Sequence, residues 1–597
     1  MSRSRWRGLG REAVELALPT LVVPPLTFVS DGTEPAQGDP PRHVFRLVLL
    51  VVAALVAAPL LSLAVTAVQG TGIWEEGLGW TSLRRALFDS VALLAGTGIV
   101  VLCLGVGSAW LVSVYDFPGR GWVEPALVLP LAIPTYIVAF CYLDILHPIG
   151  PVQTGLRGLL GLARPADLWW FPDVRSTGMC ALLLGFVLYP YVYLPTRALF
   201  LAQGAELLDA ASSLGARPGQ VFRRVALPLA RPGIVAGTSL ALLEALNDVG
   251  ASEYLGVRTL TVTIYETWVN RSNFAGAAQI ALATLLVVAA LIGAERWARR
   301  RRDMAGPEGG GRADRRRLSG WRAAAALALA LVPVLVGFAA PSLHLVLSAA
   351  SRIGYAGLSP TLVDETIATV LLALAATSAI VLLALVLACG GRLFPSRGSA
   401  WLRWTAALGY GVPGIILAVG CLAPLVAIDG IMAGIVGAVS GFEIGLVLVG
   451  SSAALVYVYA VRFLAVALGA IEAGLAKVPL SLDEASLGLG ARRTGTVGRI
   501  HLPLAATSIA SGALLVFVEC AKELPATLLL RPLNVETLAT HLHGEAIRGT
   551  YEDGTIAALL IVAIGLVPLA LLMRIGRPPA PGSVKERQGS EEVGAPG

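Results

Sequence analysis

The 597-residue sequence has little charge for its length. Only 14% of its residues are Asp, Glu, Lys or Arg, and 56% are hydrophobic. Soluble domains carry charge on about 25% of their residues. Stretches such as residues 47–68 hold no ionisable side chain and are long enough to cross a bilayer. This composition excludes a soluble enzyme and predicts a chain that lies largely in lipid.

Paired cysteines are also missing. The six cysteines form no Cys-x-x-Cys motif and lie in or beside apolar stretches. We expect them to be buried, unpaired thiols, with neither a disulfide framework nor a zinc site. The formal charge of +6 comes from short arginine clusters beside apolar runs, which is typical of cytoplasmic anchoring. Nucleic acid is therefore not an expected partner.

A phosphate-binding loop is absent as well. The motif GxxxxGK[ST] places a lysine directly after a glycine, and none of the three lysines (Lys477, Lys522 and Lys585) follows one. The chain is therefore expected to hydrolyse no ATP. We also find no nucleophile or His/Glu cluster at a membrane face, which argues against a polytopic membrane enzyme.

Long apolar runs predict an all-α polytopic membrane protein with about twelve spans. The first six are expected at residues 47–68, 88–114, 122–146, 178–200, 232–256 and 275–294. The second six are expected at residues 323–347, 362–389, 401–427, 444–466, 506–530 and 555–573.

The chain divides into two six-span halves with basic segments around them. We expect an N-terminal tail at 1–45, a first half at 46–295, a flexible linker at 296–322, a second half at 323–575 and a tail at 576–597. The N-terminal apolar run contains Glu15 and several prolines and has no small-x-small cleavage site, so a cleaved signal peptide is not expected. The arginine excess puts both tails and the linker in the cytoplasm.

Two predicted cytoplasmic loops repeat one pattern, at residues 205–228 and 480–503. Gly215 and Gly490 lie 275 positions apart, and so do Pro228 and Pro503; we call this separation the repeat offset. Each glycine follows a short helical pattern and suits the left-handed residue that ends a helix. A second helical stretch then leads into the next span. An ordinary amphipathic connector explains one copy, but two copies in register indicate a shared device.

These loops resemble the EAA motif, E-A-A-x3-G-x9-I-x-L-P, of binding-protein-dependent ABC importer permeases. The fused arrangement resembles the ferric-iron members of that family. Asp209 replaces Glu in the first copy and Ser486 replaces Ala in the second. The matching residues are Asp209, Ala210, Ala211, Gly215, Leu227 and Pro228, then Glu484, Ala485, Ser486, Gly490, Leu502 and Pro503.

The resemblance implies that each loop seats on an ATPase subunit. Two copies of a separate ABC ATPase, which would bind ATP and Mg²⁺, are then the expected partners, together with an extracytoplasmic substrate-binding protein and the lipid bilayer. This chain itself is expected to bind no cofactor and no metal. The implied location is the bacterial cytoplasmic (inner) membrane.

Four carboxylates occupy equivalent positions in the predicted fifth and eleventh spans, Glu244, Asp248, Glu519 and Glu523, and Glu253 lies near the outer end of the fifth. The repeat offset relates Glu244 to Glu519 and Asp248 to Glu523. Within each half the two carboxylates are spaced i, i+4, which predicts that they share one helix face. Ionisable groups inside a membrane indicate function by default, so we expect a translocation path that favours a cation. Satisfaction of polar neighbours is the alternative.

The substrate is expected to be ferric iron. The segments that resemble the iron permeases run from Leu246 to Ala251, Thr259 to Tyr265, and Lys522 to Pro532. Thiamine or another small solute remains an alternative substrate, and a secondary transporter remains an alternative class. His541 and His543 invite a metal-site interpretation, but a surface position is favoured. Pro134 and Pro413 predict breaks in the third and ninth spans.

Overall fold

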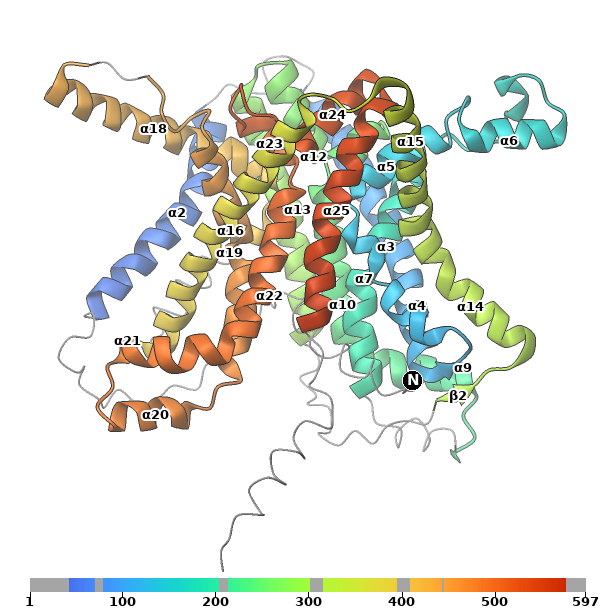
Figure 1. Ribbon diagram of the computed structural model, residues 1–597, viewed down its shortest axis with the longest axis horizontal. Coiled ribbons are helices and arrows are strands. Elements are labelled where there is room, and N and C mark those ends of the chain that lie inside the picture. The colour runs from blue at the N-terminus through green and yellow to red at the C-terminus, as the bar shows by residue number, and fades with distance from the viewer. Residues whose placement is uncertain are drawn as a thin grey trace, which may run out of the picture.

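The computed structural model describes residues 42–69, 79–202, 213–300, 315–394, 408–442 and 445–575. Within these ranges it is an almost entirely helical bundle (Figure 1). Eleven helices are long and apolar enough to cross a membrane, and the count is twelve if one bent pair forms a single span. The prediction of an all-α polytopic membrane protein with about twelve spans is confirmed.

The first part of the chain contains one long helix per apolar run, with short helices between them. Its elements are α2 (Arg42–Gln69), α3 (Gly79–Val114), β1 (Tyr115–Asp116), α4 (Arg120–Ala126), η2 (Leu129–Ala132), α5 (Thr135–Ile145), α6 (Pro151–Leu160), η3 (Pro165–Leu168), α7 (Thr177–Ala202), α9 (Pro218–Val221), η4 (Phe222–Ala226), α10 (Leu227–Asn247), α11 (Gly250–Tyr254), α12 (Leu260–Tyr265), η5 (Glu266–Asn270) and α13 (Phe274–Arg300).

The second part repeats this order. Its elements are β2 (Arg316–Arg317), α14 (Gly320–Val334), η6 (Leu335–Ala339), α15 (Ala340–Ala356), α16 (Leu362–Leu393), η7 (Leu408–Gly411), α18 (Gly414–Ser440), α19 (Ser452–Ala476), α20 (Leu480–Gly488), α21 (Arg493–Thr496), η8 (Val497–His501), α22 (Leu502–Ala521), α23 (Pro525–Leu530), α24 (Leu538–Arg548) and α25 (Tyr551–Ile575). The first residues of α7 and α19, α9 and α21, α10 and α22, and α11 and α23 are each separated by the repeat offset.

Proline breaks the third span where the sequence predicted it. The segment 120–132 and α5 meet at 92°, with Ile133 and Pro134 between them. Pro413 likewise stands directly before α18. Proline lacks the amide hydrogen that a continuous helix needs, so the chain turns there and begins a new helix.

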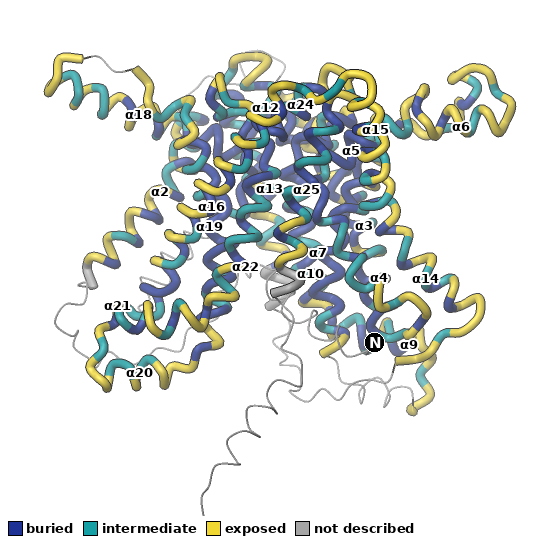
Figure 2. Tube along the Cα trace, viewed as in Figure 1, coloured by how far each residue is buried: buried dark blue, intermediate teal, exposed yellow. Residues whose placement is uncertain are grey.

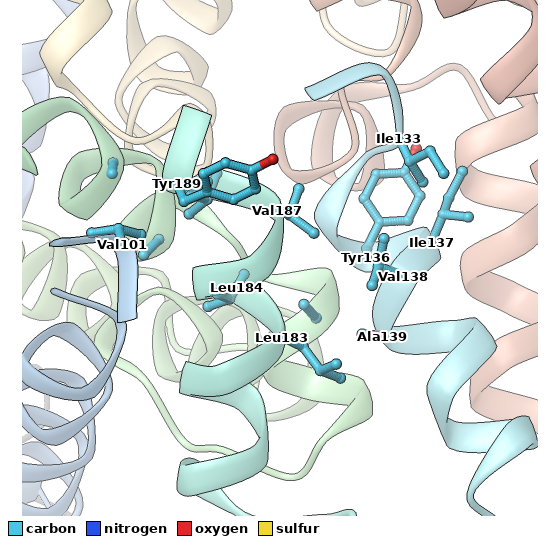
Figure 3. Packing of buried hydrophobic residues seen from close by; sticks show 14 of the residues in the cluster. Val101, Ile133, Tyr136, Ile137, Val138, Ala139, Leu183, Leu184, Val187 and Tyr189 are labelled. Atoms are coloured by element: carbon cyan, nitrogen blue, oxygen red, sulfur yellow. The ribbon is translucent and has the colours of Figure 1, made fainter. Parts of the chain in front are cut away.

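Small residues bring the helices α3, α5 and α7 of the first half close together (Figure 3). A Cβ atom built on Gly105 would lie 2.7 Å from the Cβ of Val192, closer than van der Waals contact allows. Val101, Leu184 and Tyr189 are fully buried in the same cluster. Close backbone approach through glycine is how membrane helices gain packing contacts without a hydrophobic driving force.

The two halves are intertwined. Helix α2, at the start of the first half, packs on α18 and α13, while α14 and α15 pack on α3, α5 and the last helix, α25 (Figure 1). One buried cluster joins side chains of α3, α7 and α25, and the other joins α2, α16 and α19. Neither half therefore completes its core without the other.

The outer helices α2 and α14 carry exposed positions along their length (Figure 2), and many of the exposed side chains are large and apolar. Helices α2 and α14 expose Leu47, Leu61 and Leu329 on their outer faces. Five cysteines are buried as expected, but Cys103 is exposed, and all six are free. The helix α20 lies at one end of the bundle, and α6, α12 and α24 lie at the other.

Several predicted boundaries shift in the structure. Helix α19 of the tenth span begins at Ser452 and not at residue 444, and residues 401–407 of the expected ninth span lie outside the described residues. The fifth ends at Asn247 instead of residue 256, because the chain breaks there. Arg316–Arg317, inside the predicted flexible linker, pairs as a short parallel strand with Tyr115–Asp116. Residues 1–41 of the N-terminal tail, residues 301–314 of the linker and the C-terminal tail lie outside the described residues.

Candidate functional site

A cavity of about 90 Å³ lies between the two halves, at the centre of the bundle. All four carboxylates predicted for a translocation path line it: Glu244, Asp248, Glu519 and Glu523. They are joined there by Arg462 and Lys522, and by aromatic side chains that include Tyr136 and Tyr191. The structure therefore brings together equivalent side chains of the two halves, which are far apart in the sequence.

The predicted i, i+4 geometry of the carboxylate pairs is wrong. Helix α10 ends at Asn247 and Asp248 is extended, with φ −77° and ψ 105°. Helix α22 ends at Ala521, before Glu523. Asp248 and Glu523 therefore stand in the breaks that follow the helices of Glu244 and Glu519. They reach the cavity because the chain turns, and not because they share a helix face.

Asp248 and Glu523 each accept backbone amides of the short helix that follows. Asp248 Oδ1 accepts the Ala251 amide at 2.7 Å. Glu523 accepts the amides of Ala526 at 3.0 Å and Thr527 at 3.1 Å. The first amides of a helix have no partner within it, and a carboxylate satisfies them. These two side chains thus hold the breaks in shape.

Two cations of the second half pair with carboxylates of the cavity. Arg462 Nη1 donates to Glu523 Oε1 at 2.6 Å, and Lys522 Nζ lies 2.8 Å from Glu519 Oε1. A Cβ atom on Gly414 would collide with the Arg462 guanidinium, so glycine there makes room for this pair. Val187 and Asn247 stand at the equivalent positions of the first half. Glu244 and Asp248 have no ion-pair partner among the described residues.

Glu244 lies close enough to Glu519 for the two carboxylates to repel each other. Tyr410, from η7 of the second half, donates to Glu244 at 3.4 Å. Four carboxylates against two cations give the cavity a formal excess of two negative charges. The arrangement is thus an acidic chamber whose first-half carboxylates lack cations.

Sequence reasoning missed Arg462 and Tyr410. Arg462 lies inside the predicted span 444–466, and the rule that selected the carboxylates applies equally to it. Tyr410 carries no such signal, because its position depends on how η7 packs against the first half.

The second repeated loop forms the expected helix and turn. Glu484, Ala485 and Ser486 lie on α20, none of whose residues is buried. Gly490 has φ +79°, its amide donates to the Leu487 carbonyl, and the Ala491 amide donates to the Ser486 carbonyl. These two bonds and the left-handed glycine form a Schellman motif. Leu502 and Pro503 begin α22.

The first repeated loop is described in part. Gly215 has φ +85°, so it also adopts the left-handed conformation. Leu227 and Pro228 begin α10. Asp209, Ala210 and Ala211 lie outside the described residues. The predicted second helical stretch runs through α9 and η4 without a break into α10.

His541 and His543 are not surface residues. Both lie on α24, and His543 is 3% exposed. His543 Nε2 lies 2.9 Å from Glu253 Oε2 of the first half, and His541 Nδ1 lies 3.1 Å from Glu365 Oε1 on α16. The hydrogen bond with Glu365 raises the pKa of His541. No group of three or more metal-ligating side chains occurs among the described residues.

Comparison with known proteins identifies the family. Residues 101–303 match the model of the binding-protein-dependent transport system inner membrane component. The molybdenum transport system permease protein ModB of Mycobacterium tuberculosis is 31% identical over 266 residues, which are 42% of this chain and 92% of that protein. This chain belongs to that permease family. ModB of Escherichia coli is 30% identical over 212 residues, 34% of this chain and 89% of ModB.

Two further relatives of the permease are PhnU, which is named for a different cargo, and y4fN, which is matched over a smaller share of its length. The putative 2-aminoethylphosphonate transport system permease protein PhnU of Salmonella choleraesuis is 28% identical over 272 residues, 42% of this chain and 91% of PhnU. The probable ABC transporter permease protein y4fN of Sinorhizobium fredii is 27% identical over 177 residues, 30% of each chain.

The permease is therefore a multi-pass inner-membrane subunit of an ABC importer and not an enzyme. Its family implies an ATPase and a substrate-binding protein as partners. The ModB proteins are named for molybdenum transport and PhnU for 2-aminoethylphosphonate transport, so these relatives do not support the expectation of ferric iron.

Proposed function

We propose that this single chain supplies both halves of the translocation path of an ATP-driven importer, and that its cargo is a small cation, with ferric iron the first candidate. The acidic cavity between the halves carries the proposal. A binding protein on the outer side would deliver the cargo, and two ATPase subunits would drive its passage inward. Both termini of the chain would lie in the cytoplasm.

Length supports the two-half arrangement. The 266 residues matched to ModB are most of that protein but less than half of this one. The relative y4fN is about as long as this chain, because the same 177 residues are 30% of each. The four pairs of helices whose starts are separated by the repeat offset support the same arrangement. Two parallel repeats place equivalent side chains around one central axis.

Charge supports a cationic cargo. A chamber with a formal excess of two negative charges repels a free oxyanion and attracts a cation, and low dielectric strengthens both effects. Glu244 has no ion-pair partner among the described residues, so it is available to a passing ion.

The names of the relatives favour a second candidate, a small oxyanion. ModB is named for molybdenum and PhnU for 2-aminoethylphosphonate. Lys522 and Arg462 are the two cations that such an anion would meet in the cavity. Both are already paired with carboxylates, so an anion would first have to break those pairs.

Uptake in a defined system tests the proposal. The chain, its ATPase and its binding protein are reconstituted in proteoliposomes, and entry of ferric iron, thiamine, molybdate and 2-aminoethylphosphonate is measured with and without ATP. ATP-dependent iron uptake supports the cation. ATP-dependent uptake of molybdate or the phosphonate, without iron, would refute the cation and leave the permease assignment intact. Uptake driven by an ion gradient without ATP would favour a secondary transporter.

A further inference from the structure

The helix α20 presents two different faces. Asp483, Ser486 and Leu487 are half-buried against the rest of the bundle, whereas Glu484 and Ala485 are exposed. Their spacing places the half-buried residues on one side of the helix. The side that carries Glu484 is the one proposed to seat on an ATPase. Motion of α20 would therefore be transmitted to the membrane-spanning helices through the side of α20 that carries the half-buried residues.

Asp483 connects that inner side to two other elements. Its Oδ2 accepts Arg392 Nε, from the end of α16, at 2.7 Å. Its Oδ1 lies 2.8 Å from His501 Nε2, in the segment that leads into α22. The carboxylate therefore joins α20 to α16 and to the helix that carries Glu519. Ser486 adds a hydroxyl contact of 2.9 Å with Thr496.

Arg392 extends the connection to a third element. Its guanidinium also donates to the Leu475 carbonyl and, at 2.8 Å, to the Val478 carbonyl, at the end of α19. Asp483, Arg392 and His501, which we call the latch, thus join α16, α19, α20 and α22 at one end of the bundle.

The latch is shielded from solvent. Side-chain exposure is 16% for Asp483, 11% for Arg392 and zero for His501. Exposed ion pairs contribute little, because water and salt screen them. Hydrogen bonds to a charged group that is partly buried are stronger and hold a defined geometry. The latch is therefore suited to transmit force between helices.

The sequence of the first half lacks an Asp and a His at the positions equivalent to Asp483 and His501. At the repeat offset, Leu208 corresponds to Asp483 and Ala226 corresponds to His501. Neither side chain of the first half ionises or donates a hydrogen bond. The two repeated loops therefore share the motif but differ in how the chain can attach them to the spans.

We propose that Asp483 is a positioning residue for transport: it transmits motion of the second ATPase-binding loop to α16 and α22. The proposal rests on the proposed function, because it requires that α20 binds an ATPase. Asp483 itself lies on the side of α20 that faces the bundle, and not on the side proposed to bind the ATPase.

The test compares the reconstituted complex of wild type, Asp483→Asn, Arg392→Gln and the double variant. Asparagine keeps the size of Asp483 and removes its charge. The readout is the number of cargo ions transported per ATP hydrolysed, together with the amount of ATPase bound. Asp553→Asn is the matched control, because Asp553 pairs with Arg352 at 2.6 Å on other helices, α25 and α15.

We expect Asp483→Asn to bind the ATPase normally and to transport at least about fivefold less cargo per ATP, within the usual range of coupling between sites. The double variant should lose no more than the worse single variant, because both remove one link. Asp553→Asn should match wild type.

Unchanged transport per ATP in Asp483→Asn, with the ATPase bound, would overturn the latch and leave the proposed function standing. A fall in folded complex that leaves the ratio unchanged would also overturn it, because it would show a purely structural role. Failure of the wild-type chain to bind an ATPase would overturn both proposals.

Discussion

Asp248 and Glu523 occupy equivalent positions in the two halves and perform the same structural task, each accepting amides of the short helix that follows a break in a membrane span. Their partners differ, because only Glu523 also accepts a guanidinium, from Arg462. The four carboxylates of the cavity therefore divide into two that shape the breaks and two, Glu244 and Glu519, that lie on the helices before them.

This division predicts different effects of neutralisation. Glu244→Gln with Glu519→Gln should slow cargo uptake much more than it lowers the amount of folded complex. Asp248→Asn with Glu523→Gln should lower the folded amount, because an amide oxygen accepts the backbone amides more weakly than a carboxylate does, and because loss of the Glu523 charge leaves Arg462 without its ion-pair partner, which costs about 3–5 kcal/mol. Uptake and detergent-extracted folded protein are measured for both. Unchanged uptake in the first variant would remove those residues from the path.

Bulky residues at the two left-handed glycines should uncouple transport. Gly215→Val and Gly490→Val place a β-branched side chain at φ +85° and +79°, which costs of the order of 1–2 kcal/mol or more. In the part of the chain that the structure describes, no atom lies within 4 Å of a Cβ at either position, so the strain expected there is in the backbone. We expect insertion to persist while ATP-driven uptake falls in the double variant.

The control is Gly495→Ala, in a helix of the same loop, where φ is not positive and space is open. It should leave uptake near the wild-type level. Normal uptake in the double valine variant would argue decisively against the role given to these loops.

The purified chain should hydrolyse no ATP by itself. None of its three lysines follows a glycine, so it has no loop to hold phosphates. Phosphate release is measured before and after the ATPase subunit is added, and activity should depend wholly on that addition. Robust hydrolysis by the chain free of other subunits would contradict this prediction.

The link between His541 and Glu365 should make stability depend on pH. The pKa of His541 is raised in the folded state, whereas the unfolded value is about 6.5. The link therefore stabilises the fold fully below about pH 6.5 and loses that contribution as pH rises through the folded pKa. Melting temperature in detergent should fall over this range.

Glu365→Gln should flatten that part of the profile, because an amide does not favour the charged imidazole. His147→Gln is the control, since His147 is exposed and faces no carboxylate partner among the described residues. An equal fall of melting temperature in Glu365→Gln and wild type would assign the pH dependence to other groups.

The number of spans and the repeated loops were predictable because each depends on local sequence. Apolar length fixes a span, and Gly490 ends a helix through its own backbone freedom. The sequence also located four side chains of the cavity, although their geometry differed. Helix periodicity carries no information about where α10 and α22 stop. It therefore predicted helical positions for Asp248 and Glu523, which lie beyond the ends of these helices.

Contacts between distant segments were not predictable in this way. The sequence predicted a surface position for His543, but the packing of α24 places it beside Glu253 of the other half. Arg392 and His501 have no sequence pattern that joins them to Asp483, because the three come together through the packing of α16, α20 and α22.

The exchange of helices between the halves has a consequence for synthesis. The ribosome delivers α2 first, yet its packing partner α18 emerges only after the whole first half and two further long segments have been made. Helix α13 of the first half can pack on α2 earlier, but the contact with α18 must wait for the second half. Membrane helices can insert first and associate later. Because α2 has no charge between Leu47 and Val68, it can lie stably in lipid before it contacts α18. Assembly of the core is thereby postponed until the second half enters the membrane.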